Sequence, residues 1–177
     1  MGFSFVWEQR ANQMTEGTLH DANAASLKFG EAQPEDLDLL LRFMESLQED
    51  DPWSIAFNPA QARRAMQQLL GNPSLGRVWI IHGAAEAIGY IVMSFDFSLE
   101  YGGRNAWIDE FFIQRSHRGK GIGTRVLEFF AEQAQALGVT AIHLEVNHGN
   151  PALELYRRMG YQDHQRYLMT KRLPPKD

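Results

Sequence analysis

Residues 113–124 read IQRSHRGKGIGT, and they join an apolar segment to an amphipathic one. The upstream segment, 105–113 (NAWIDEFFI), has the aromatic and β-branched composition of a strand. The downstream segment repeats apolar residues at helical spacing as far as Leu137-Gly138. Glycines therefore occupy positions 119, 121 and 123 between a strand and a helix N-terminus, where free backbone N–H groups favour a phosphate.

Spacing separates three phosphate-binding motifs that compete for this loop. A dinucleotide fingerprint that starts at Gly121 needs glycine where Val126 stands, and one that starts at Gly119 needs glycine in place of Thr124. A nucleotide P-loop needs Ser or Thr after Gly-Lys, whereas Gly119-Lys120 is followed by Gly121. The loop therefore satisfies neither motif, and the pattern that it does carry is Arg-x-x-Gly-x-Gly over residues 118–123.

The rest of the chain alternates between helical and strand-like patterns. Apolar residues at helical spacing predict helices that start near Pro34 and Pro59, and short apolar runs predict a hairpin from 78–81 and 87–95. After the long helix, the patterns predict a strand at 141–146, a short helix at 151–159 and a final strand at 166–172. This order predicts one mixed sheet covered by helices on both sides, with residues 26–177 as one domain and residues 1–25 as an N-terminal extension.

The Arg-x-x-Gly-x-Gly pattern resembles the coenzyme A loop of the GNAT N-acetyltransferase superfamily. Residues 150–161 (NPALELYRRMGY) look like the closing motif of that family, an alanine and then a leucine-tyrosine on a short helix before Gly-Tyr. The two motifs stand in the family's order and separation, and the expected elements from 27 to 173 are similar to its fold. The resemblance implies an α/β (α+β) fold with a mixed, mostly antiparallel central sheet flanked by helices.

The same resemblance implies a site for acetyl-CoA as cosubstrate. The backbone of Phe111, Phe112 and Ile113 would pair with the pantetheine arm, and Tyr156 would act as general acid toward the departing thiolate. Many relatives carry an asparagine three residues before the helix alanine, where this chain has Gly149; of the two nearest asparagines, Asn147 and Asn150, we favour Asn150 as the cofactor contact. The pyrophosphate would be held by the loop residues Arg118, Gly119, Lys120, Gly121, Ile122, Gly123 and Thr124.

The chain contains no cysteine, which excludes an acyl-cysteine intermediate, a disulfide framework and a thiolate zinc site. Direct attack of an amine on the thioester therefore fits, and it needs a base and a general acid. The base is Glu110, Glu145 or a water beside one of them. The six histidines lack metal-ligand spacing, so we predict no metal.

Charge and composition limit the classes of partner that this chain can bind. The chain has 17 basic and 22 acidic side chains and a net charge of −5, which argues against nucleic acid and favours a cationic partner. We attribute the basic residues around the glycine loop to cofactor phosphates. The first residues lack the pattern of a secretory signal, and no run approaches the ~18 apolar residues of a membrane span. We therefore expect a cytoplasmic protein with no membrane partner.

The acceptor is expected to be a primary amine, and the acidic residues favour a cationic one. We expect these acids to converge on one pocket beside aromatic rings, where a cationic small molecule would bind. Protein or peptide N-acetylation and a non-catalytic acyl-CoA-binding sensor are the alternatives, and a homodimer is a further option. The acids are Glu49, Asp50, Asp51, Asp96, Glu100, Asp109 and Glu110, and the aromatic residues are Trp53, Phe57 and Tyr101.

Overall fold

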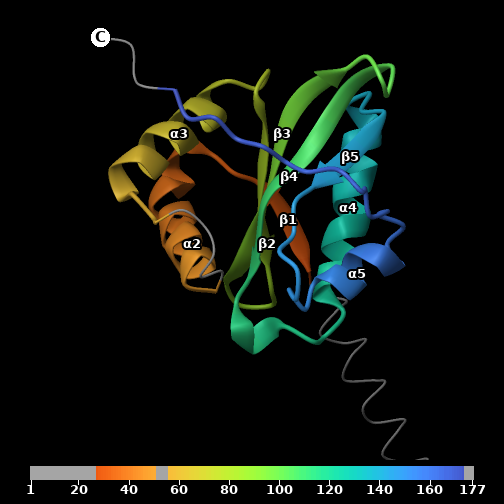
Figure 1. The fold of residues 1–177 in the computed structure, drawn as a ribbon. Helices are drawn as coiled ribbons and strands as arrows, with labels where there is room; N and C mark the ends of the chain where they lie inside the picture. The colour runs from red at the N-terminus through yellow and green to blue at the C-terminus, as the bar shows by residue number, and fades with distance from the viewer. Residues whose placement is uncertain (1–26, 51–55, 174–177) are drawn as a thin grey trace, which may run out of the picture.

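The structure is a computed structural model that describes residues 27–50 and 56–173, and it is built on a five-stranded sheet (Figure 1). The strands lie in chain order: β1 (Lys28–Glu31), β2 (Gly76–His82), β3 (Ala87–Ser98), β4 (Gly103–Ile113) and β5 (Ala141–Leu144). The first four pair antiparallel, and β5 runs parallel to β4. The predicted mixed, mostly antiparallel sheet is confirmed.

Helices cover both faces of the sheet (Figure 1). Helices α2 (Leu37–Asp50) and α3 (Pro59–Gly71) pack on one face, and α4 (Ile122–Ala136) and α5 (Leu153–Arg158) pack on the other. Two short 3-10 turns, Pro34–Asp36 and Arg115–His117, precede α2 and α4. Helix α3 begins where the sequence predicts, because the Asn58 side chain accepts a hydrogen bond from the Gln61 N–H (3.1 Å).

The alternation of side chains along the central strands divides the core into two layers. On β3, Tyr90 and Val92 face α2 and α3, whereas Ile91 and Met93 face α4 and α5. A register shift falls between Val92, which pairs with Glu110, and Met93, which pairs with Ile108. Asp109 is therefore the extra residue of a bulge in β4, and this bulge brings Glu110 opposite Val92.

Two predictions about strands need correction. Strand β1 was not expected, because only Phe29 among its four residues is strongly apolar. The predicted final strand at 166–172 is wrong: residues 162–173 have no regular structure and pair with no strand, and Tyr167 and Met169 are 96% and 88% exposed. Apolar composition alone does not make a strand without a pairing edge and a core to cover.

Some expectations concern residues that the structure does not describe. The extension at 1–25 lies outside the described ranges, as do Asp51 and Trp53. Within the described ranges, no helix is long and apolar enough to cross a membrane.

Candidate active site

Strands β4 and β5 separate halfway along β4. They pair only from Asn105 with Ala141 to Ile108 with Leu144, whereas β4 continues to Ile113. Among the described residues, no strand pairs with the last part of β4 on the side away from β3. This open edge, residues 109–113, presents backbone groups that an extended ligand can bind.

Strand alternation determines which backbone groups face the open edge. The Gln114 N–H donates to the Ile88 carbonyl on β3 (2.8 Å), so the backbone of Phe112, two residues earlier, also faces β3. Phe111 and Ile113 then face the open edge. The Ile113 carbonyl accepts from Arg118 Nε (2.6 Å), which leaves the Ile113 N–H and both backbone groups of Phe111 for a ligand. Of the three residues predicted to pair with pantetheine, Phe112 directs its backbone groups toward β3 and not toward the open edge.

The open edge leads into the glycine loop and the N-terminus of α4. Gly119 and Gly121 have φ of +73° and +75°, in the left-handed region where L side chains are strained. A Cβ atom at either position would meet no atom within 4 Å, so the space beside the loop is open. Gly121 caps α4, and its carbonyl accepts the first helical bond from the Arg125 N–H (3.4 Å).

The N–H groups that precede this first bond belong to Ile122, Gly123 and Thr124, and they form the positive end of α4. A pyrophosphate fits here, because the loop leaves room and the donors point away from the helix. Gly123 has a second reason to be glycine, since a Cβ there would lie 2.8 Å from Leu155 Cδ2 on α5. The loop residues therefore fit the phosphate end of acetyl-CoA, and the open edge of β4 fits its extended arm.

Three basic side chains of residues 113–124 are already engaged. Arg118 binds the Ile113 carbonyl and forms an ion pair with Asp50, which also pairs with Arg115. Burial would raise the pKa of Asp50, but the hydrogen bonds and charges of both arginines outweigh it and lower that pKa. Lys120 Nζ donates to the Ser116 carbonyl (2.8 Å). Arg118 thus ties the end of α2 to the loop.

Glu110 is a half-buried carboxylate in the middle of the site. Its Oε2 accepts a hydrogen bond of 2.7 Å from the Tyr90 hydroxyl. Burial raises the pKa of Glu110 to about 7; the Tyr90 hydrogen bond opposes this shift and the charge of Asp109 adds to it. Burial also raises the pKa of Asp109. Glu145, the other candidate base, is exposed just after β5. Glu110 can therefore take up or release a proton near neutral pH.

Tyr156 lies on α5 and is 9% exposed within the core layer under α4. Burial raises its pKa to about 12, so its hydroxyl is protonated at neutral pH and can donate. Its ring lies 5.7 Å from that of Tyr161. Asn150, the predicted cofactor contact, makes a hydrogen bond within its own segment: its Oδ1 accepts from the Ala152 N–H (2.8 Å) at the start of α5.

The acidic residues do not converge on one pocket as predicted. Glu100 precedes β4 and accepts two hydrogen bonds from Arg166 (2.8 and 3.0 Å), whereas Asp50 pairs with arginines that follow β4. The two carboxylates thus lie near opposite ends of a strand of 11 residues. Of the predicted acids that the structure describes, Asp109 and Glu110 lie on the part of β4 where β5 separates from it.

Sequence reasoning missed two groups of side chains. Tyr90 was read only as part of a hairpin strand, although its hydroxyl binds Glu110. His143 on β5 lies between two aromatic rings, 5.1 Å from that of Trp107 and 4.9 Å from that of Tyr101. Both contacts join strands, so no local spacing in the sequence could have indicated them.

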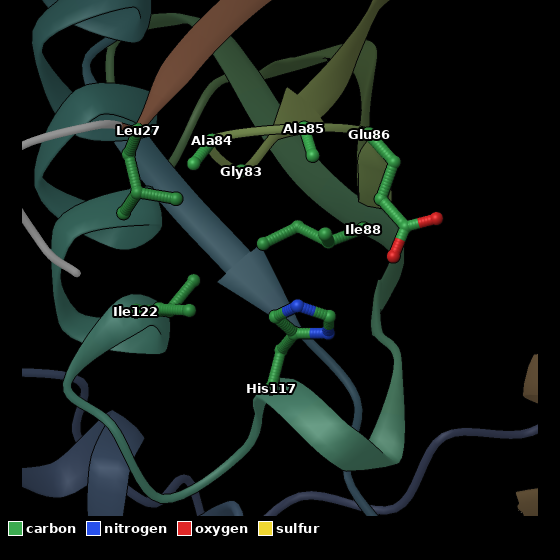
Figure 2. A pocket seen from close by; sticks show the side chains of 8 residues that line it. All are labelled: Leu27, Gly83, Ala84, Ala85, Glu86, Ile88, His117 and Ile122. Carbon is green, nitrogen blue, oxygen red and sulfur yellow. The ribbon is translucent and has the colours of Figure 1, made fainter.

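A small cavity of about 140 Å³ adjoins the glycine loop on the β2–β3 side (Figure 2). The His117 ring points into it, and apolar side chains of Leu27, Ile88 and Ile122 line it (Figure 2). His117, which the sequence grouped with the phosphate-binding basic residues, contacts Ser116 Oγ through Nδ1 (3.0 Å). None of the residues that line the cavity belongs to the open edge of β4, residues 109–113.

The split sheet and the glycine-capped helix define an α/β domain built to hold an extended ligand with a phosphate-bearing end. Residues 40–161 match the model of the acetyltransferase (GNAT) family. The chain therefore belongs to this family, whose acyl donor is acetyl-CoA, and the family membership predicted from the sequence is confirmed.

Individual relatives agree with this assignment. An integron cassette protein from the Cole Harbour Salt Marsh metagenome is 36% identical, with a TM-score of 0.72 over 84% of this chain and 91% of that one. A predicted acetyltransferase of Clostridium acetobutylicum, solved with acetyl-CoA, shares the fold at 20% identity, with a TM-score of 0.71 over 82% and 96% of the two chains.

Bovine (Bos taurus) thialysine N-epsilon-acetyltransferase is 32% identical over 77 residues. That match covers 43% of this chain and 45% of the relative, so it spans less than half of the curated protein's length.

Proposed function

We propose that this protein transfers the acetyl group of acetyl-CoA directly to a primary amine of a small cationic molecule. The observation that carries this proposal is the open edge of β4, which runs into a glycine-capped helix N-terminus. A pantetheine arm can pair with the backbone of Phe111 and Ile113 while a pyrophosphate binds the N–H groups at the start of α4.

Two ionisable side chains supply the proton transfers. When bound, acetyl-CoA supplies the thioester carbonyl that the amine attacks. Glu110, whose pKa is about 7, accepts the proton that the amine loses. Tyr156, which is protonated at neutral pH, donates a proton to the departing sulfur. The chain has no cysteine, so the acetyl group passes to the amine without a cysteine-bound intermediate.

Two observations support a cationic acceptor. The relative that matches 77 residues is named for acetylation of thialysine, an amine-bearing amino acid. In this chain, Asp109 and Glu110 place two carboxyl groups in the middle of the site, while Arg115 and Arg118 are paired with Asp50. A peptide acceptor, a non-catalytic sensor role and a homodimer stay predictions.

The acceptor class can be tested by coenzyme A thiol release with three sets of amines at equal concentration. Polyamines and lysine-like amino acids form one set, lysine-containing peptides the second, and neutral or anionic amines the third. We expect the first set to react fastest, with a rate that rises with pH through about 7 as Glu110 loses its proton. Fastest reaction of neutral or anionic amines would refute the cationic acceptor, and fastest reaction of peptides would replace the small molecule with a protein substrate.

Tyr156→Phe is expected to lower turnover by roughly 100-fold, because it removes the proton donor for the departing sulfur. The aromatic ring and its packing stay, so acetyl-CoA binding should change by no more than a few-fold. Tyr167→Phe, which removes the hydroxyl of a 96% exposed tyrosine, is the matched control. Steady-state rates together with calorimetric affinities measure both effects, and unchanged turnover in Tyr156→Phe would remove this residue from the mechanism.

A further inference from the structure

Tyr90 is the partner of the proposed base, and its position is unusually constrained. It lies in the middle of β3, is 0% exposed and donates its hydroxyl to Glu110 Oε2 at 2.7 Å. Within the described ranges, this hydroxyl is the one side-chain group that hydrogen-bonds the Glu110 carboxylate. This hydrogen bond fixes one carboxylate oxygen of the proposed base, Oε2.

The ring of Tyr90 is held from the helix side of the sheet. Its centroid lies 5.9 Å from that of Phe43 on α2 and 6.5 Å from that of Phe112 on β4. Packing of this kind leaves an aromatic side chain few alternative rotamers. A phenylalanine would satisfy the same packing, so the hydroxyl adds nothing to the core except the bond to Glu110.

We propose that Tyr90 is a positioning residue for acetyl transfer, whose buried hydroxyl keeps the Glu110 carboxylate ionised and oriented toward the incoming amine. This inference rests on the proposed role of Glu110 as base. Tyr90 itself acts through Glu110 and keeps its own proton, because burial and the charge of Glu110 raise its pKa well above the usual 10.0.

The groups around Glu110 determine how strongly its ionisation depends on the Tyr90 hydroxyl. On β4 itself, Asp109 opposes ionisation of Glu110. From β3 the facing group is Tyr90, and α2 presents the Phe43 ring to this region. Asp50, at the end of α2, is neutralised by Arg115 and Arg118. Burial and Asp109 thus favour the protonated acid, and the Tyr90 hydrogen bond favours the carboxylate.

The direction of the effect follows from this balance. A hydrogen bond to the charged form lowers a carboxyl pKa, so its removal in Tyr90→Phe raises the pKa of Glu110 above about 7. We expect the acid limb of the rate profile to move up by about one pH unit. The rate at pH 7 should then fall about five-fold, and the difference should nearly vanish at pH 9, where both carboxyl groups are ionised.

The experiment uses the full chain and two readouts. The first is the pH profile of acetyl transfer in wild type, Tyr90→Phe and Phe43→Leu. The second is titration of the Glu110 carboxyl by carbon-13 NMR, assigned by its loss in Glu110→Gln. Phe43→Leu loosens the packing of the Tyr90 ring but keeps the hydroxyl, so it should lower stability without moving either midpoint.

An upward shift in both readouts, specific to Tyr90→Phe, supports the proposal. Unchanged midpoints in Tyr90→Phe, or an equal shift in Phe43→Leu, would overturn it, because the hydroxyl would then have only a packing role. The two proposals fail separately. If no amine is acetylated by wild type, the proposed function fails, whereas the NMR titration still decides whether Tyr90 controls the ionisation of Glu110.

Discussion

Gly121→Glu is expected to abolish acetyl-CoA binding and leave the sheet and helices intact. Gly121 caps α4 in the left-handed region, and no atom lies within 4 Å of the position that a Cβ would take. A glutamate there projects a negative charge into the space beside the first N–H groups of the helix. Because that space must receive a pyrophosphate, we expect affinity to fall by more than roughly 100-fold.

Gly102→Glu is the matched control for this variant. Gly102 has φ of +74°, and a Cβ there also meets no atom within 4 Å, so the backbone strain and the added charge are the same. It lies in the turn between β3 and β4, at the far end of β4 from the glycine loop. Calorimetry should show wild-type affinity for Gly102→Glu. Equal affinity in both variants and wild type would exclude the loop as the phosphate site.

Glu110→Gln is expected to lower the rate of acetyl transfer by roughly 100-fold at pH 7, because glutamine cannot accept the amine proton. Glutamine keeps the size of the side chain and can still bond to the Tyr90 hydroxyl, so the fold should be retained. The pH dependence around 7 that comes from Glu110 should also disappear. Part of the rate should return at high pH, where the free amine no longer needs a base.

Steady-state rates from pH 6 to pH 10 measure this effect. Glu128→Gln on α4 serves as the control, since its side chain is exposed on the other face of the sheet. A loss that appears in Glu145→Gln and not in Glu110→Gln would transfer the role of base to the exposed carboxylate after β5. Full activity of both Glu110→Gln and Glu145→Gln would leave an ordered water as the base.

Features that depend on neighbouring residues in the chain could be predicted from the sequence. The glycine loop, the start of α4 and the cap of α3 all follow from residue types within a few positions of each other. The short apolar run at 87–95 likewise predicts the strand that forms β3. These local signals were sufficient to predict the family and the class of cofactor.

Features that depend on partners far along the chain could not be predicted. Strand β1 forms because its backbone pairs with β2, although its own composition is not that of a strand. The segment 166–172 has strand-like composition but pairs with no strand. The sequence predicted that Arg118 binds a cofactor phosphate, whereas in the structure its guanidinium binds the carboxylate of Asp50 on α2. The two residues lie 68 positions apart, so their contact could not be predicted from local spacing.

The bulge at Asp109 has the greatest consequence for the site. A regular β4 would shift every later residue by one position and exchange the faces of Glu110 and its neighbours. No signal in residues 105–113 indicates the bulge. The hydrogen bond between the Tyr90 hydroxyl and Glu110, and the near-neutral pKa of the proposed base, could therefore be recognised only from the structure.

Backbone amide NMR signals, followed as acetyl-CoA is added, locate the binding site of the cofactor directly. We expect saturable shifts at Phe111, Ile113, Ile122 and Thr124, with small changes at Phe112, whose N–H faces β3, and at residues 83–86 beside the small cavity. Shifts centred on residues 83–86 and His117, or no saturable change along the end of β4, would contradict the assignment of this open edge as the acetyl-CoA site.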